Sequence, residues 1–189
     1  MPKLILLRHL QSQWNLENRF AGWTDVALSE EGIKSAKEVT EKLSNSKIDV
    51  IYTSPLKRNR STVQLVLEHL NRKNIPVIVD KALDERNYGE LQGLNKDEVK
   101  KQYGEEQVKL WRRGWNQAPP GGESLKTVFK RVVSFYEKNI EKDLKKGKNV
   151  LVVASHNSLR ALVKHLERIP DKDIINLEIP TASLREYDF

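Results

Sequence analysis

The sequence predicts an α/β protein, a three-layer α/β/α sandwich with a mostly parallel central sheet. Short aliphatic and β-branched runs alternate along the chain with amphipathic stretches, which is typical of strands connected by helices. The runs contain few polar residues, as expected for strands that helices cover on both faces. The chain has 189 residues, the length of one domain. Because no repeat or Gly/Ser linker interrupts it, we expect residues 1–189 to form a single domain.

Four runs predict the parallel strands, and a run near the C-terminus predicts one more strand. Each run is rich in Val, Ile or Leu and is bounded by polar or turn residues. The predicted strands are Lys3 to Leu7, Val50 to Thr53, Pro76 to Val79, Asn149 to Ala154 and Leu184 to Tyr187.

The stretches between these runs have helical periodicity. Ser29 precedes two acidic residues and is a candidate N-cap. Behind it, Ile33, Ala36, Val39 or Thr40, and Leu43 are expected to form the buried stripe of the helix. Further helices are predicted from about Lys57 to Leu70, Asn95 to Tyr103, Glu123 to Leu144 and Ser158 to Leu166, with a short one after Pro170.

Composition limits the classes of function. The chain contains no cysteine, which excludes disulfides and thiolate chemistry. No signal-peptide pattern follows Met1 and no apolar run could span a bilayer, so we expect a cytoplasmic protein without a membrane partner. The formal net charge of +7 fits either nucleic acid or a small phosphorylated substrate. Charge alone does not separate these two partners.

Two histidines follow predicted strands. Arg8 and His9 come at the end of the first run, and His156 comes shortly after the fourth. The carboxyl ends of parallel strands form the crevice where ligands bind, so both histidines could reach one phosphoryl group. An Arg-His pair is also common by chance. His69 and His165 lie in helical patterns beside leucines and are interpreted as structural.

Other candidate residues lie in segments that begin a helix or lack periodicity. Arg58 is at the start of a helix, where a phosphate would be favoured. The polar, glycine-containing segment 83–96 has the composition of a functional loop. It offers Glu85 as general acid or base, Tyr88 as a hydroxyl donor and Lys96 as a counter-ion. Each of these residues, taken alone, also fits an ordinary surface position.

A cluster of aromatic and basic residues runs from Trp111 to Trp115, with Arg112 and Arg113 between the two tryptophans. The tryptophans could stack nucleotide bases. Alternatively, a tryptophan anchors a helix while both arginines reach one anion.

Taken together, these residues resemble the cofactor-dependent phosphoglycerate mutases of the histidine phosphatase superfamily, and the likeness runs nearly from end to end. The motifs that carry it are Arg8-His9 with Ser12-Gln13-Trp14-Asn15, Glu17-Asn18-Arg19-Phe20, Gly22-Trp23, Leu28-Ser29-Glu30, Leu56-Lys57-Arg58, Glu85-Arg86, Tyr88-Gly89, Leu91 to Lys96, Trp111-Arg112-Arg113 and Asn157-Ser158-Leu159-Arg160. An extended match of this kind is far more specific than the Arg-His pair.

The resemblance implies a phosphohistidine mechanism. His9 would be phosphorylated in turnover, Arg8, Arg58 and His156 would surround the phosphoryl group, and Glu85 would be the acid and base. The implied substrate-binding residues are Asn15, Gly22, Tyr88, Lys96, Arg112, Arg113 and Asn157. The implied reaction interconverts 3-phosphoglycerate and 2-phosphoglycerate, is primed by 2,3-bisphosphoglycerate and needs no metal. The implied partner is a small phosphorylated three-carbon substrate and not nucleic acid, and a homo-oligomer is compatible with it.

The sequence departs from the family pattern beside the first histidine. Leu10 stands where the family has glycine, which is costly if the backbone there needs a positive φ. Gln11, where mutases usually carry Glu, is a milder change. Ala21 stands where the family usually has Thr or Ser, so one hydroxyl contact to substrate is lost.

A second departure concerns the other histidine. The family motif has His-Gly before Asn-Ser, whereas this chain has Ser155-His156. In an alignment without a gap, Ser155 takes the histidine position. With a local shift of one residue His156 keeps it, and we favour the shift.

The sequence ends at Phe189, where many members continue into a lid-like tail, so more phosphatase activity is expected. Three interpretations remain: a mutase, a histidine-type phosphomonoester phosphatase, or an anion-binding relative with weakened catalysis.

Overall fold

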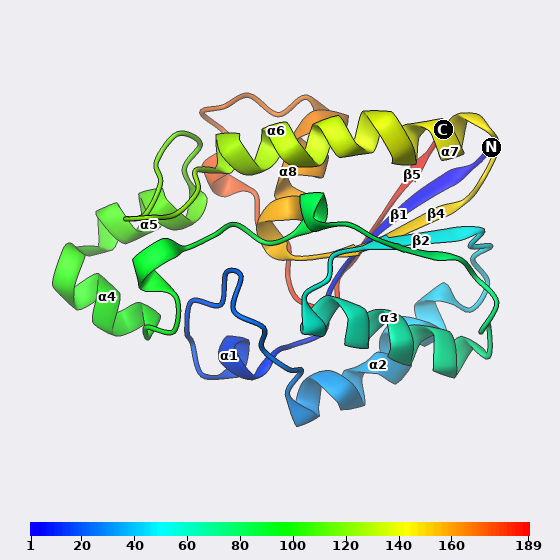
Figure 1. Cartoon of the computed structure of the whole chain (residues 1–189), viewed down its shortest axis with the longest axis horizontal. Coiled ribbons are helices and arrows are strands. Elements are labelled where there is room, and N and C mark those ends of the chain that lie inside the picture. The colour runs from blue at the N-terminus through cyan, green and yellow to red at the C-terminus, as the bar shows by residue number, and fades with distance from the viewer.

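A five-stranded sheet runs through the centre of the protein, with helices on both faces (Figure 1). The computed structural model describes all residues, 1–189. The strand order is β3-β2-β4-β1-β5. The first four strands in this order are parallel, and β5 is antiparallel to β1 at the edge. The strands are β1 (Lys3–Arg8), β2 (Val50–Thr53), β3 (Val77–Val79), β4 (Val150–Ala154) and β5 (Leu184–Asp188).

Alternation along the strands divides the core between the two faces of the sheet. Leu4 and Leu6 of β1 belong to a cluster that includes residues of α6 (Leu125–Phe135) and α8 (His156–Glu167). Ile5 and Leu7 belong to a second cluster with α2 (Glu30–Leu43) and α3 (Lys57–Leu70). Figure 1 shows the two helix pairs on opposite sides of the strands. The α/β/α sandwich with a mostly parallel sheet is therefore confirmed.

The start of α2 follows the predicted capping pattern. The Ser29 hydroxyl accepts a hydrogen bond from the Gly32 amide at 3.0 Å. The predicted buried stripe is wrong at Ile33, whose side chain is 48% exposed. A Cβ at Gly32 would lie 2.1 Å from the Gln11 carbonyl oxygen, so the helix approaches the chain closely on this side and turns Ile33 outward.

Two predicted helix boundaries differ from the structure. The helix expected from Glu123 begins after its N-cap Ser124 and passes through a π-helical turn, Tyr136–Ile140, into α7 (Glu141–Lys145). The helix expected from Ser158 begins at His156, two residues earlier. The second difference matters for function, because it places His156 on the first turn of α8.

The helices α1 (Gln13–Leu16), α4 (Lys96–Tyr103) and α5 (Glu105–Arg113) lie beyond the carboxyl ends of the strands (Figure 1). The sequence had not predicted α5. A small apolar cluster joins Val99 of α4 to Val108 and Trp111 of α5 and also includes Phe20 and Tyr88. Helices α4 and α5 therefore flank the crevice at the end of the sheet.

Neighbouring strands bring the two histidine segments together. Arg8 pairs with Ala154 at the ends of β1 and β4, and the His9 amide donates to the Ala154 carbonyl at 3.1 Å. The residues that follow the two strands therefore meet at one edge of the sheet, where open α/β sheets bind ligands. None of the helices combines the length and the apolar character needed to cross a bilayer.

Candidate active site

One narrow pocket of about 90 Å³ lies in this crevice. All of the residues predicted for the catalytic and substrate-binding site line it: Arg8, His9, Asn15, Gly22, Arg58, Glu85, Tyr88, Lys96, Arg112, Arg113, His156 and Asn157. Arg19, Phe20, Ala21 and Glu178 complete the lining. His69 and His165 lie outside the pocket, and His165 packs edge-on against Phe129 and Tyr136.

His9 is held as a neutral imidazole with one nitrogen free. Its Nδ1 lies 2.7 Å from the carbonyl oxygen of Leu10. A carbonyl only accepts, so Nδ1 carries the proton and Nε2 keeps its lone pair. Burial lowers the pKa of His9 well below its ordinary value, and the charges of Arg58 and Arg8 lower it further. His9 is therefore a nucleophile that does not need to lose a proton first.

Leu10 fits the backbone without strain. Only Asn18, Asn71, Arg168 and Ala182 have positive φ among the residues that are not glycine. The Leu10 side chain is fully buried in the cluster between the sheet and α2 and α3, and its amide donates to Thr62 Oγ1 at 3.1 Å. The condition under which leucine would be costly after His9 is not met.

Two arginines, the half-buried Arg8 and the buried Arg58, line the pocket with His9 and are held by backbone carbonyls. Arg8 Nη1 donates to the Ile179 carbonyl at 2.5 Å, while Arg8 Nε has no partner. Arg58 donates to the carbonyls of Thr24 and Gly22 at 3.1 and 2.7 Å. Burial lowers the pKa of Arg8 to about 10, so it stays charged at neutral pH. Both guanidinium groups are placed to bind an anion next to His9.

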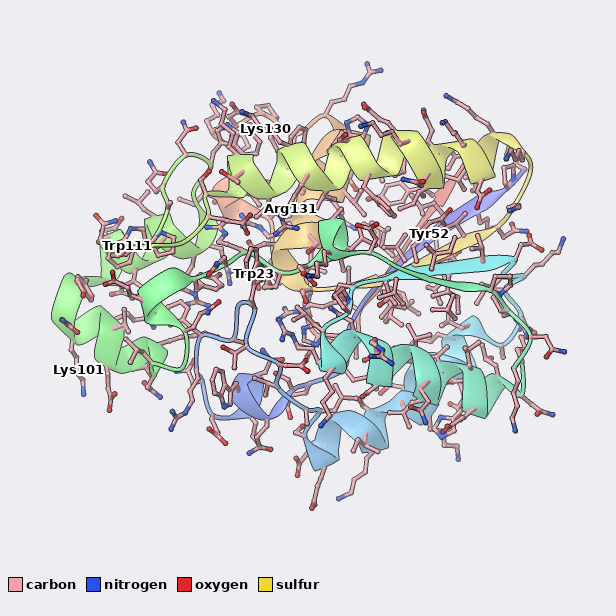
Figure 2. The ribbon with its side chains drawn as sticks, viewed as in Figure 1. Trp23, Tyr52, Lys101, Trp111, Lys130 and Arg131 are labelled. Carbon is pink, nitrogen blue, oxygen red and sulfur yellow. The ribbon has the colours of Figure 1, made fainter.

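Hydrogen bonds to both the carboxylate and the backbone carbonyl of Glu85 hold this residue in place. Its Oε1 accepts from the amides of Arg86 and Asn157 at 2.6 and 3.1 Å, so the carboxylate caps the start of α8. Trp23 and Arg131, both labelled in Figure 2, donate to its backbone carbonyl at 2.7 and 2.9 Å. The Glu85 carboxylate is therefore held in a fixed position in the same pocket as His9, where it could accept a proton.

His156 lines the pocket, whereas Ser155 does not. Ser155 is fully buried behind it, and its hydroxyl accepts from Asn59 Nδ2 at 3.1 Å. Arg113 Nη1 lies 3.5 Å from His156 Nδ1. Since arginine only donates, the proton of the neutral ring is on Nε2, which is buried and has no hydrogen-bond partner. Burial and the charge of Arg8 hold the pKa of His156 well below its ordinary value.

Behind the pocket, two fully buried arginines that sequence reasoning did not assign to the site hold Asn157. Arg86 and Arg160 donate to Asn157 Oδ1 at 3.3 and 3.0 Å, and Asn157 Nδ2 donates to the Tyr88 hydroxyl at 3.2 Å. Arg160 also donates to the carbonyl of Arg113 at 2.8 Å. Both arginines belong to motifs quoted for the family, which was the available signal for them.

The end of α5 supplies two more arginines to the pocket. Arg112 and Arg113 line it, while Trp111 is buried in the cluster with Phe20 and Trp115 packs on the main core. The tryptophans are therefore not free to stack bases, and the arrangement is the second alternative: helix anchors with both arginines at one site. Burial and the charge of Arg112 lower the pKa of Lys96 to about 8.

Arg19 and Phe20 were missed but lie in a motif quoted for the family, just before Ala21 and Gly22. Nothing in the sequence pointed to Glu178. It is one of three acids, with Asp171 and Asp173, in the segment between α8 and β5. Six basic side chains line the pocket, against the carboxylates of Glu85 and Glu178: Arg8, Arg19, Arg58, Lys96, Arg112 and Arg113. No three His, Cys, Asp or Glu side chains are grouped to hold a metal ion. The chemistry that this arrangement supports is attack by His9 on the phosphorus atom of a bound phosphate ester.

Comparisons with known proteins give the family. The sequence model of the histidine phosphatase superfamily (branch 1) matches residues 4–189. A 2,3-bisphosphoglycerate-dependent phosphoglycerate mutase from Cytophaga hutchinsonii is 47% identical and covers 100% of this chain and 88% of its own. A phosphoglycerate mutase from Schizosaccharomyces pombe is 46% identical over 95% of this chain and 86% of its own.

A solved structure of mycobacterial glucosyl-3-phosphoglycerate phosphatase with VO3 is similar in fold. It is 28% identical, with a TM-score of 0.85 over 98% of this chain and 92% of its own. The family match spans nearly the whole chain, and the two mutases share almost half of its residues. The chain belongs to branch 1 of the histidine phosphatase superfamily.

Proposed function

We propose that the protein is a 2,3-bisphosphoglycerate-dependent phosphoglycerate mutase, which interconverts 3-phosphoglycerate and 2-phosphoglycerate through a phosphohistidine on His9. One observation carries the proposal: a neutral histidine with a free Nε2 lies in a pocket lined by six basic side chains. The full-length relatives named as such mutases support it. We place the activity in the cytoplasm and in one catalytic domain, residues 1–189.

The charge of the pocket suits a doubly phosphorylated primer. Besides the six basic side chains, Arg8 Nε and His156 Nε2 are buried donors without partners, which is costly unless an acceptor binds. When bound, 2,3-bisphosphoglycerate supplies the phosphoryl group that activates His9. Arg8, Arg58 and the Nε2–H of His156 would hold the oxygens around the phosphorus atom. Asn15, Gly22, Tyr88, Lys96, Arg112, Arg113 and Asn157 would hold the rest of the ligand.

His9 and Glu85 divide the chemistry between them. Phosphorylated His9 gives its phosphoryl group to one hydroxyl of a bound phosphoglycerate, while Glu85 takes the hydroxyl proton. The free Nε2 of His9 then attacks the phosphorus atom of the phosphate on the neighbouring carbon, the bond from phosphorus to the ester oxygen breaks, and Glu85 returns the proton to that oxygen. The net change moves the phosphate between carbons 2 and 3 and restores phosphorylated His9.

A labelling experiment tests this reaction. We expect 2,3-bisphosphoglycerate carrying labelled phosphate to leave an acid-labile label on the wild-type protein, and the labelled protein to isomerise 3-phosphoglycerate. His9→Ala removes the nucleophile and should abolish both. His69→Ala is the matched control, because His69 is exposed on α3 outside the pocket. A protein that takes no label, or an active His9→Ala variant, would contradict the proposal.

A second candidate function is hydrolysis of phosphate esters by the same phosphohistidine. The similarity to the mycobacterial glucosyl-3-phosphoglycerate phosphatase favours it. In that case water replaces the substrate hydroxyl as acceptor and inorganic phosphate is released. Measuring phosphate release beside isomerisation in the same labelling experiment separates the two: label with phosphate release alone assigns a phosphatase.

A further inference from the structure

One acidic side chain stands among the cations that should bind substrate. Glu178 Oε2 lies 2.6 Å from Arg113 Nη2, and Glu178 Oε1 lies 3.2 Å from His156 Nε2. Its carboxylate therefore touches two groups that the proposed function gives to the ligand. The Glu178 side chain is 52% exposed, so it stands at the mouth of the pocket.

The contact with His156 is close but incomplete. Although 3.2 Å separates the two atoms, His156 Nε2 makes no hydrogen bond, because the carboxylate oxygen is not aligned with the N–H. A buried donor in this state gains from any better-aligned acceptor. Glu178 thus occupies the position of an anionic ligand, but it leaves the N–H of His156 without the hydrogen bond that a ligand oxygen would accept.

Hydrogen bonds fix the backbone on both sides of Glu178, whereas its side chain is held only by the contacts with Arg113 and His156. The Leu177 carbonyl accepts from Arg160 Nε at 3.0 Å, and the Ile179 carbonyl accepts from Arg8 Nη1 at 2.5 Å. Rotation about the side-chain bonds is therefore enough to move the carboxylate into solvent. With Glu178 inside, the pocket has about 90 Å³, against roughly 300–1,000 Å³ for typical small-molecule sites.

We propose that Glu178 determines which anions this pocket accepts: its carboxylate occupies the subsite formed by Arg113 and His156, and a ligand must displace it. A phosphate dianion interacts with the same cations more strongly than a single carboxylate does, so it displaces Glu178 where a monoanion gains little. The subsite lies in the pocket of the proposed function and the inference rests on that function for its substrate.

Binding of inorganic phosphate to Glu178→Gln tests the inference without turnover. Calorimetric titrations at constant ionic strength would compare the variant with the wild type. Removing the internal competitor should tighten phosphate binding about tenfold, which corresponds to ~1.4 kcal/mol. The matched control is Glu186→Gln, which makes the same charge change in β5, where Glu186 pairs with Lys3 and not with the pocket. Its phosphate affinity should stay within twofold of the wild type.

An unchanged or weaker phosphate affinity in Glu178→Gln would overturn the inference and assign Glu178 to holding Arg113 and His156 in position. A thermal unfolding curve for each variant confirms that both are folded. The two proposals fail separately. If Glu178→Gln binds phosphate more tightly but the wild-type protein takes no label on His9, the inference about Glu178 stands and the mutase proposal fails. If His9 is labelled but the phosphate affinity of Glu178→Gln is unchanged, the mutase proposal stands and the inference about Glu178 fails.

Discussion

At His9, one backbone hydrogen bond selects the reactive form of the side chain. The Leu10 carbonyl fixes the proton on Nδ1, and burial between Arg8 and Arg58 keeps a second proton off Nε2. Leucine serves here as well as a smaller residue would, because the Leu10 carbonyl makes the contact while its side chain fills the core beneath. Leu10 therefore orients the His9 ring through its backbone and contributes to the core through its side chain.

The first prediction at this scale concerns Leu10. Leu10→Ala should lower the free energy of unfolding by about 3 kcal/mol, since it removes a fully buried side chain and leaves a cavity. Leu16→Ala, at a half-exposed position of α1, should change it by no more than ~0.5 kcal/mol. Urea denaturation measures both. Equal losses in the two variants would contradict the packing role of Leu10.

The second prediction concerns Lys96. Burial and Arg112 lower its pKa to about 8, so it is charged below this pH and loses its charge above it. The value of kcat/KM for phosphoglycerate should therefore fall as pH rises through about 8, because kcat/KM follows the ionisation of the free enzyme. Lys96→Arg should remove this fall, because arginine keeps its charge.

The control for Lys96 is Lys101→Arg on the exposed side of the same helix, α4 (Figure 2). It should keep the pH profile of the wild type. If Lys96→Arg shows the same loss above pH 8 as the wild type, another group is responsible for it.

Among the elements, α5 and α8 are joined by one buried side chain. Arg160 of α8 donates to the carbonyls of Arg113 at the end of α5, of Ile174 in the short 3-10 helix Ile174–Asn176, and of Leu177 beyond it. Burial lowers the pKa of Arg160 to about 9, because a charged guanidinium loses its hydration inside the protein. Hydrogen bonds to these carbonyls offset the free-energy cost of that lost hydration. The position of Arg113 in the pocket therefore depends on a residue outside it.

Replacing Arg160 tests this connection. Arg160→Met should lower the free energy of unfolding by about 3 kcal/mol, since several buried carbonyls lose their donor. It should also raise the KM for phosphoglycerate, because the end of α5 is released. Arg185→Met, at an exposed arginine of β5 that pairs with Glu167, should alter neither quantity appreciably. A folded Arg160→Met protein with the KM of the wild type would contradict the connection.

The elements also show what periodicity can and cannot predict. Strands and long helices follow from local patterns, which is why β2 and α3 match their predicted bounds. Helix α8 was predicted to begin at Ser158, but it begins at His156 with Ser155 as its N-cap residue. The carboxylate of Glu85, from another part of the chain, accepts from the Asn157 amide in its first turn, a contact that periodicity does not reveal. Glu178 was missed for the same reason, since its role depends on contacts across the fold.

Over the whole molecule, the net charge of +7 is partly concentrated in one place. Six of the 33 basic residues line a pocket that holds two carboxylates. Like charges brought together in a protein interior repel one another, so the folded state carries a cost that a bound polyanion removes. Ligand binding should therefore be visible as stability.

Thermal unfolding in the presence of phosphate tests this at the scale of the molecule. At a concentration about 100 times the Kd, phosphate should stabilise the protein by ~2.7 kcal/mol and raise Tm by about 5–10 °C relative to NaCl of equal ionic strength. Arg113→Gln should lose most of this rise. Lys109→Gln, an equal change of charge on an exposed position of α5, should keep it. An equal rise in NaCl, or in both variants, would mean that general screening of the basic surface stabilises the protein and that the pocket does not.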